Sequence, residues 1–133
     1  MSNGRIVSCT HGKDKSRKLS ALHRGIQGEQ YAAAFLVRKG LEIIVRNYRC
    51  RRGEVDLIAR DGDVLVFVEV RWRTGNLYGG AENSIDFYKQ RRLIAAARHY
   101  LGCREDVPAC RFDAILIEGK AGTLRWLQDI FWL

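Results

Sequence analysis

The sequence predicts one α/β domain in which helices flank a mixed β-sheet. Two stretches with helical periodicity alternate with stretches that are rich in β-branched and aromatic residues. The dipeptide Asp61-Gly62 separates two of the β-rich stretches, and it is typical of a tight hairpin turn. The chain has 133 residues, of which 47% are apolar, so a single domain can bury a core without disulfide bonds.

The N-terminal part of the chain predicts a tail followed by a helix. Residues 1–19 show no periodicity, and they carry five basic residues against one acidic residue. We therefore expect a flexible basic extension over residues 1–19 and a folded domain over residues 20–133. The first helix is expected from Ser20 to Lys39, because Gly40 is a typical residue directly after a helix end.

Three strands are predicted after this helix. Residues 41–50 indicate the first strand through their β-branched and aromatic content. Residues 54–60 and 63–73 indicate the second and third strands, which the hairpin turn joins. A two-residue turn at this point pairs Arg60 with Asp63.

The second half of the chain predicts a helix and a second hairpin. Residues 74–82 form a glycine-containing loop, and Asn83 or Ser84 then caps a helix that runs to about Leu101. The hairpin closes the chain with strands near residues 111–118 and 123–131. The predicted order is therefore α-β-β-β-α-β-β, with one sheet flanked by helices.

An acidic residue interrupts the apolar face of the first helix. This face has the spacing of three and four residues that places side chains together: Leu22, Ile26, Glu29, Ala33 and Leu36. A buried carboxylate is costly unless a partner compensates for it. Glu29 therefore either faces a polar site at the open end of the sheet or lies at the edge of the face and reaches solvent.

The third strand changes from apolar to charged part-way along one of its faces. One face carries Val64, Val66, Val68, Val70 and Trp72, and the other carries Leu65, Phe67, Glu69, Arg71 and Arg73. An apolar pattern on both faces indicates a central strand that is covered on both sides. The switch at Glu69 marks either the emergence of the strand into solvent or a polar site.

The hairpin register brings three carboxylates onto one face of the sheet. Asp56 lies opposite Phe67 in the register that the turn sets. Glu54 then lies opposite Glu69, so neighbouring negative charges require a counter-charge. An arginine of the third strand or a divalent cation could supply it, and carboxylate oxygens are ligands that Mg²⁺ prefers.

These acidic residues lie in motifs that resemble those of a known nuclease superfamily. GEVDLI at residues 53–58 and VFVEVR at residues 66–71 follow Glu29 in the arrangement of PD-(D/E)xK nucleases. More closely, the chain resembles the YraN family of small bacterial proteins over about residues 25–131. The match also includes Gly28, Asn47, Tyr48, Arg73, Lys89, Leu93 and Arg111-Phe112-Asp113. The resemblance implies a restriction-endonuclease-like αβββαβ core, related to archaeal Holliday junction resolvases.

The resemblance also implies roles for individual residues. Asp56 and Glu69 would be paired ligands of Mg²⁺ or Mn²⁺. Glu29 would support the metal from the first helix, and Val70 would offer its backbone carbonyl. The metal would polarise a phosphate oxygen and activate a water molecule for hydrolysis of a phosphodiester bond.

Position 71 departs from the motif, because the usual lysine is replaced by Arg71. Arginine does not lose its proton in proteins, so it is a poor base, but it can clamp a phosphate and stabilise developing charge. We therefore group Arg71 with Asp56 and Glu69 as candidate catalytic residues, with Glu54 in support. Lys89 is a second candidate source of positive charge. The alternative is a salt bridge from Arg71 to Glu69 or Glu54 that leaves the cluster inactive.

The net charge of +8 favours a polyanionic partner, although charge alone also serves solubility. The candidate contacts to nucleic acid, and to DNA in particular, are Arg49, Arg51, Arg52, Arg73, Lys89 and Arg92. Tyr78 is a candidate for stacking on a base. The aromatic residues Trp126, Phe131 and Trp132 either complete the core or cover the surface of a homodimer.

The sequence also indicates a compartment. The four cysteines are too widely spaced for a zinc site and are expected to be reduced. No apolar run approaches the roughly twenty residues of a membrane span, and the first residues do not resemble a secretory signal. We therefore expect a cytoplasmic protein without a membrane partner.

Three functions are consistent with these features. The first is a metal-dependent DNA endonuclease, with branched or structured DNA as a suitable substrate. The second is a nucleic-acid-binding module with impaired cleavage, and the third is a metal-free interaction protein. Glu29, Asp56 and Glu69 favour the first function, whereas Arg71 favours the second.

Overall fold

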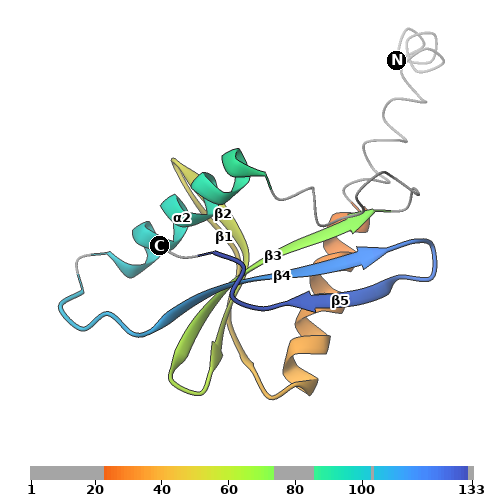
Figure 1. Ribbon diagram of the computed structural model, residues 1–133, viewed down its shortest axis with the longest axis horizontal. Helices are drawn as coiled ribbons and strands as arrows, with labels where there is room; N and C mark the ends of the chain where they lie inside the picture. The colour runs from red at the N-terminus through yellow and green to blue at the C-terminus, as the bar shows by residue number, and fades with distance from the viewer. Residues whose placement is uncertain (1–22, 74–85, 103, 132–133) are drawn as a thin grey trace, which may run out of the picture.

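A five-stranded mixed sheet forms the centre of the computed structural model, which describes residues 23–73, 86–102 and 104–131 (Figure 1). The strands are β1 (Glu42–Cys50), β2 (Gly53–Asp61), β3 (Val64–Arg73), β4 (Cys110–Glu118) and β5 (Thr123–Leu127). They lie in the sheet in chain order. β3 and β4 pair in parallel, with helix α2 (Phe87–Leu101) as their connection, and the other described pairs are antiparallel. The predicted α/β class is confirmed.

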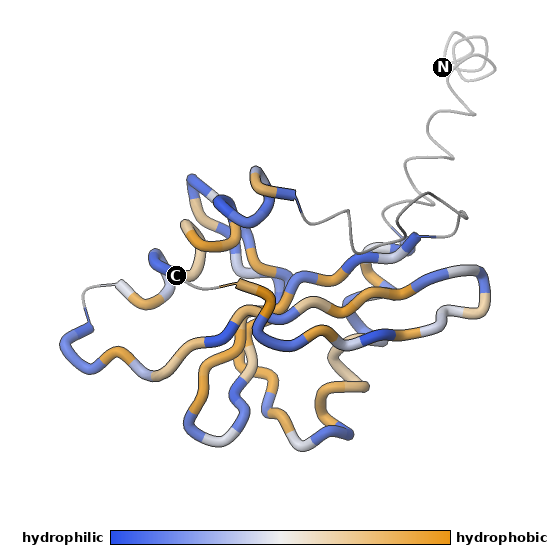
Figure 2. The backbone as a smooth tube through the Cα atoms, viewed as in Figure 1, coloured by the Kyte–Doolittle hydropathy of each residue, from blue (hydrophilic) through white to orange (hydrophobic). Residues whose placement is uncertain are grey.

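The two helices cover opposite faces of the sheet. The N-terminal helix, described over residues 23–38, packs on a core that includes Leu57, Val66, Val68 and Ile115. Helix α2 packs on a second core that includes Ile58, Phe67, Leu93 and Phe112. Hydrophobic residues run along the strands, and hydrophilic residues concentrate at the turns (Figure 2). The prediction that β3 is a central strand covered on both faces is thus confirmed.

The buried face of the N-terminal helix differs in part from the predicted one. Ile26 is 48% exposed, and Leu22 lies outside the described residues. The buried face instead begins at Gly28 and continues to Leu36. A Cβ atom at Gly28 would lie 3.6 Å from the ring of Trp72, at ordinary van der Waals contact, so the helix packs directly on the sheet at this residue. Glu29 is half-buried at the margin of this face.

The turn between β2 and β3 differs from the predicted turn. Asp61 pairs with Val64, so the turn residues are Gly62 and Asp63. Gly62 has a φ of 61°, which suits the first turn position of a type II′ hairpin, where glycine is preferred. The predicted pairing of Arg60 with Asp63 is therefore wrong.

The corrected turn moves the register by two residues. Phe67, which we expected opposite Asp56, pairs with Ile58. One step beyond the last described pair, the same register places Asp56 opposite Glu69, where we expected Glu54. Because side chains alternate with a period of two, a shift of two residues leaves the paired side chains on their predicted faces.

Helix α2 begins later than predicted. Its N-cap is Asp86, whose carboxylate accepts a hydrogen bond from the backbone N–H of Lys89 at 2.9 Å. The predicted caps, Asn83 and Ser84, lie outside the described residues and precede the observed start. The predicted end at Leu101 is confirmed.

The last strand is shorter than predicted, because β5 ends at Leu127 rather than near residue 131. The backbone N–H of Ile130 then donates to the carbonyl of Phe112 at 2.8 Å. The ring of Phe131 stacks on that of Phe112 with centroids 4.7 Å apart. Phe131 therefore completes the core on the α2 side of the sheet.

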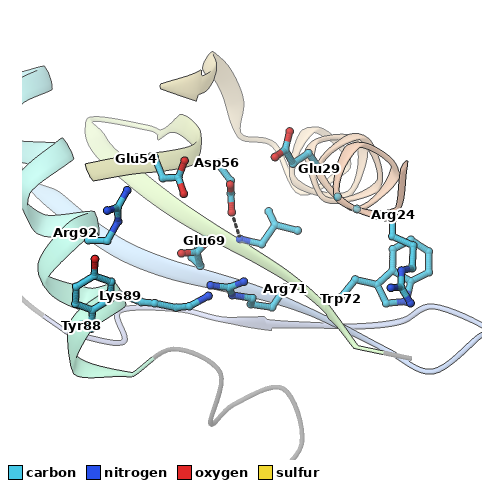
Figure 3. Close-up of a pocket in the computed structure, with 13 residues that line it drawn as sticks. Arg24, Glu29, Glu54, Asp56, Glu69, Arg71, Trp72, Tyr88, Lys89 and Arg92 are labelled. Carbon is cyan, nitrogen blue, oxygen red and sulfur yellow. Dashed lines mark hydrogen bonds between the residues drawn. The ribbon is translucent and has the colours of Figure 1, made fainter. Parts of the chain in front are cut away.

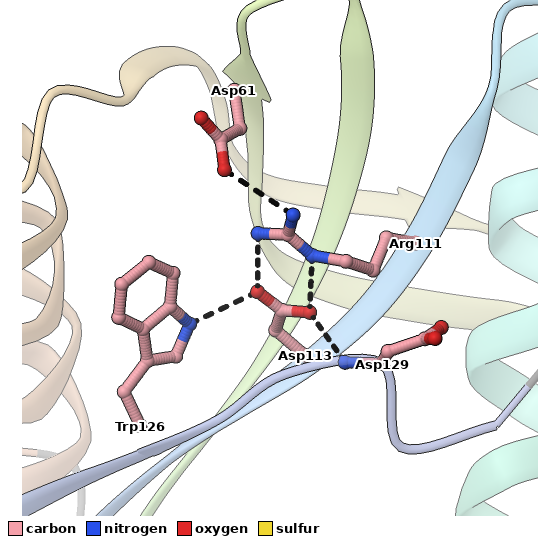
Figure 4. Close-up of polar contacts among 5 residues, drawn as sticks. All are labelled: Asp61, Arg111, Asp113, Trp126 and Asp129. Atoms are coloured by element: carbon pink, nitrogen blue, oxygen red, sulfur yellow. Dashed lines mark hydrogen bonds and ion pairs between the residues drawn. The ribbon is translucent and has the colours of Figure 1, made fainter.

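A buried ionic network joins β2, β4 and β5 near the β2–β3 turn (Figure 4). Asp113 is fully buried and accepts two hydrogen bonds from the guanidinium of Arg111, at 2.9 and 3.0 Å. It also accepts from Trp126 Nε1 and from the backbone N–H of Asp129. Arg111 in turn reaches Asp61 at 3.2 Å. Because each charge is paired and hydrogen-bonded, the network satisfies the conditions for burial of a carboxylate.

Three further expectations concern the cysteines, membrane spans and the N-terminal residues. Cys50 and Cys110 are free thiols, as predicted, and the other two cysteines lie outside the described residues. In the described part of the chain, neither helix has the length and apolar character needed to cross a membrane. The predicted basic extension over residues 1–19 also lies outside the described residues.

Candidate active site

A pocket opens where β2 separates from β3. The described pairing of the two strands ends at Leu57 and Val68, whereas β3 continues beside β4 as far as Arg73. The first residue of β2, Gly53, instead packs against α2. A Cβ atom at Gly53 would lie 1.9 Å from the carbonyl oxygen of Arg92. The separation leaves a cavity of about 300 Å³ that residues of both helices line (Figure 3).

The cavity wall combines carboxylates with cationic side chains. Its charged residues include Glu29, Glu54, Asp56, Glu69, Arg71, Lys89 and Arg92. They come from the N-terminal helix, from β2 and β3, and from α2. Sequence positions that are up to about sixty residues apart thus meet in one pocket.

Asp56 and Glu69 form the centre of the acidic group. Their side chains lie within hydrogen-bonding range of one another. The Oδ2 atom of Asp56 also accepts a hydrogen bond from the backbone N–H of Val70 at 2.8 Å. This contact ties the start of β2 to β3 at the point where the strand pairing has ended.

The surroundings of Asp56 strongly favour its protonated form. Burial raises the pKa of Asp56 to about 8, and the hydrogen bond and the negative charge of Glu69 act in the same direction. The Val70 N–H and the positive charge of Arg71 lower the pKa of Asp56, but by less. Two carboxyl groups at this separation therefore resist ionising together unless a cation joins them.

Glu29 lies farther along the same pocket wall. Burial raises the pKa of Glu29, and the charges of Asp56 and Glu54 add to this effect. A side-chain hydrogen bond with Asn47 opposes it. Asn47 has a φ of 54°, a left-handed conformation that asparagine tolerates better than most residues. Asn47 thus connects the N-terminal helix to β1, a role that the sequence pattern did not reveal.

The carboxylates do not form a complete metal cage. Among the described residues, no group of three or more histidine, cysteine, aspartate or glutamate side chains has the arrangement to hold a metal ion. The structure therefore brings Asp56 and Glu69 together and leaves Glu29 as a neighbour that acts through charge. A cation in this pocket would complete its ligand shell with backbone oxygen, water or a substrate phosphate.

Two cationic side chains face the acidic pair from different elements. Arg71 lies within electrostatic range of Asp56, and its buried Nε atom makes no hydrogen bond to any described group. Lys89 reaches from α2 across the pocket towards Arg71 (Figure 3). Glu54 pairs with Arg49 at 3.7 Å rather than with Arg71.

The residues predicted to bind nucleic acid fall into three places. Lys89 and Arg92 line the acidic pocket, and Arg52 lies beside Arg92 in a neighbouring groove. Arg49 and Arg51 are exposed at the end of β1 and in the turn that follows. Arg73 is at the end of β3, where its carbonyl accepts from Gly119. Tyr78 lies outside the described residues, whereas Tyr88, which we did not single out, lines the pocket.

The fold consists of a helix, a three-stranded meander, a crossover helix and a parallel fourth strand, and its acidic pair lies where β2 and β3 diverge. This arrangement defines a restriction-endonuclease-like protein. The chain belongs to the uncharacterised protein family UPF0102, whose sequence profile matches residues 28–117. This is the YraN family that the motifs indicated.

Several curated members of the family are similar to the chain over most of its length. A UPF0102 protein of Nitrosospira multiformis is 51% identical over 81% of this chain and 92% of its own length. One from Nitrosomonas eutropha is 52% identical over 84% of this chain and 96% of its own length. One from Cupriavidus taiwanensis is 54% identical over 81% of this chain and 82% of its own length.

Proposed function

We propose that the protein is a Mg²⁺- or Mn²⁺-dependent endonuclease that hydrolyses phosphodiester bonds in branched or structured DNA. The observation that carries the proposal is the Asp56–Glu69 pair, held within hydrogen-bonding range in a pocket with cationic walls. An acidic pair alone would repel a phosphate, so a cation between them is the simplest way for DNA to approach.

The residues of the pocket fit a hard divalent cation. Asp56 and Glu69 offer carboxylate oxygens that face each other, and Val70 is a candidate for a backbone oxygen ligand. Mg²⁺ usually takes one or two carboxylates together with water and substrate phosphate, so an incomplete cage suits it. When bound, the cation would supply Lewis-acid polarisation of the phosphate and a more acidic water molecule.

The side chains of the pocket have different roles in the proposed reaction. Asp56 and Glu69 hold the cation, and Glu29 adds negative charge that favours its binding. Arg71 and Lys89 bind non-bridging phosphate oxygens and stabilise the charge that develops during displacement. Arg71 does not act as a base because it keeps its proton.

A cleavage assay with metal control tests the proposal. Purified protein is incubated with labelled single-stranded, duplex, flap and four-way-junction DNA in Mg²⁺, Mn²⁺ or EDTA. We expect cutting that requires metal and is lost in both Asp56→Ala and Glu69→Ala. Calorimetric titration with Mn²⁺ should show binding to the unmodified protein and none to either variant. Cutting that persists in EDTA or in both variants would refute the proposal.

Arg71 favours a second candidate, a DNA-binding module in which cleavage is impaired. The motif position that normally carries a lysine here carries a guanidinium that cannot exchange a proton. The Arg71→Lys variant distinguishes the two functions. Binding without cutting in the unmodified protein, together with metal-dependent cutting in Arg71→Lys, would establish the impaired module.

A further inference from the structure

We propose that helix α2 carries a binding track for single-stranded DNA that leads into the acidic pocket. The inference rests on the proposed function and specifies it, because it makes an unpaired strand the part of the substrate that reaches Asp56 and Glu69. It also assigns the contact with bases to Phe87 and Tyr88.

The track is a groove along α2, lined by helix residues from Tyr88 to Arg98 and by Arg52. It has a volume of about 590 Å³, and four arginines line it: Arg52, Arg91, Arg92 and Arg98. None of the described residues that line it is acidic. Such a surface attracts a phosphate backbone, and it attracts a polymer with one negative charge per residue more strongly than a peptide with few acidic residues.

The groove lies next to the acidic pocket. Tyr88 and Arg92 line both cavities, so they form the wall between them. Figure 3 shows Tyr88 and Arg92 at the α2 side of the pocket that contains Asp56 and Glu69. A strand that follows the arginines is therefore guided towards the proposed cleavage site.

Two aromatic rings at the start of α2 lie open to solvent, and one of them, that of Tyr88, lines the track. Phe87 is 72% exposed and Tyr88 is 66% exposed, although both are large apolar side chains at the start of a helix. The guanidinium of Arg91 lies 5.8 Å from the centre of the Phe87 ring, and that of Arg92 lies 5.9 Å from the Tyr88 ring. Exposed aromatics interleaved with arginines form the platform on which single-stranded nucleic acids stack their bases.

The exposed rings of Phe87 and Tyr88 favour a single strand over a duplex as the ligand. In a duplex the base faces are stacked on one another, so only phosphates and groove edges are available to these side chains. An unpaired strand can turn its bases onto Phe87 and Tyr88 while its phosphates contact the arginines. Only a single strand can therefore combine base stacking on the rings with phosphate contacts to the arginines.

Fluorescence anisotropy in EDTA tests the track without requiring cleavage. The probe is a labelled oligothymidylate, compared with a duplex of equal length and with an abasic strand that keeps its phosphates. We expect Tyr88→Leu to weaken oligothymidylate binding about tenfold, because loss of one stacking contact has an effect of that order. Tyr88→Phe should retain binding, and neither variant should change affinity for the abasic strand.

The arginines are tested with a matched control. Arg91→Ala and Arg98→Ala should each weaken binding and reduce the slope of log affinity against log salt by about 0.7. Arg104→Ala removes an exposed arginine of the loop before β4 and should leave binding unchanged. Circular dichroism checks that each variant is folded.

The outcomes separate this inference from the proposed function. Equal affinity for duplex and oligothymidylate, or an unchanged affinity in Tyr88→Leu, would overturn the track even if metal-dependent cleavage occurs. Ring-dependent binding of the single strand supports the track even if no cleavage is seen in Mg²⁺ or Mn²⁺, a result that would refute only the endonuclease.

Discussion

At the scale of single residues, Asp56 shows most clearly how the fold changes the chemistry of a side chain. It is held beside Glu69, and burial together with that neighbour raises the pKa of Asp56 to about 8. Opposing contacts from Val70 and Arg71 do not offset this effect. The folded protein without metal therefore holds a proton between these residues that the unfolded chain releases near pH 4.

This linkage predicts a pH-dependent effect of Asp56→Asn on stability. Because the folded-state pKa lies above the unfolded value, the unmodified protein loses stability as pH rises from about 4 to about 8. The neutral side chain of the variant does not lose stability with pH in this way. Its amide oxygen can still accept the hydrogen bond from the Val70 backbone N–H. In EDTA, we compare the free energy of unfolding of Asp56→Asn with that of the unmodified protein. We expect the difference to shift in favour of the variant by at least about 1.4 kcal/mol between about pH 5 and about pH 9. Urea unfolding at each pH measures it, and an equal difference at both pH values would contradict the assignment.

Lys89 gives a prediction about activity at the same scale. Its backbone N–H, not its side chain, binds the helix cap Asp86, so substitution leaves the start of α2 intact. We expect Lys89→Ala to reduce metal-dependent cleavage about 10²-fold, as for loss of one group that stabilises developing charge. Lys89→Arg should retain most of the rate, and Lys120→Ala, at an exposed hairpin position, should have no effect. A full rate in Lys89→Ala would exclude this side chain from the reaction.

At the scale of elements, the start of β2 determines the shape of the site. The strand leaves β3 after Leu57 and packs its first residue, Gly53, against the backbone of α2. This contact opens the pocket and carries Glu54 and Asp56 towards α2. The absence of a side chain at Gly53 is therefore a condition for the pocket geometry.

Glycine substitutions test this dependence. In Gly53→Ala the new Cβ atom would clash with the Arg92 carbonyl at 1.9 Å, so β2 and α2 must separate. We expect a loss of about 2 kcal/mol in the free energy of unfolding and a fall in cleavage of about 10²-fold. Gly25→Ala is the matched control: it adds a methyl group to a helical position with open space and should stabilise by about 0.5–1 kcal/mol. Equal stability of the two variants would show that the close approach does not matter.

At the scale of the whole molecule, two polar clusters differ in how their charges are paired. The pocket of Asp56 leaves like charges close together and the buried Nε atom of Arg71 without a hydrogen-bond partner among the described residues. The network of Asp113, Arg111 and Asp61 pairs every charge that it buries. The first arrangement suits binding of ions and substrate, and the second holds three strands in place.

The paired network predicts a large effect on stability. In Asp113→Asn, Arg111 remains largely buried and loses the charge of its fully buried partner, keeping only the more exposed Asp61, so we expect a cost of about 3–5 kcal/mol. Glu42→Gln removes an exposed pair with Arg60 and should cost less than about 1 kcal/mol. Urea unfolding of both variants compares them. A similar small cost in both would mean that the buried network adds nothing beyond a surface pair.

The sequence determined the class of fold and the faces of the sheet. Alternation along residues 64–73 fixed which side chains of β3 face each helix, because backbone pleating alone sets this property. The motif around Asp56 and Glu69 also indicated two carboxylates that meet in one pocket of the structure. The pair survived an error of two residues in the register, since a shift by an even number preserves the face.

The tertiary structure alone decided which distant groups join that pair. The entry of Lys89 and Tyr88 into the pocket depends on the approach of α2 to Gly53, which no local pattern encodes. The link from Glu29 to Asn47 likewise depends on how the N-terminal helix packs against β1. Local sequence sets backbone propensity and side-chain direction, but contacts between elements depend on packing of the complete core, and so only the folded chain defines the site.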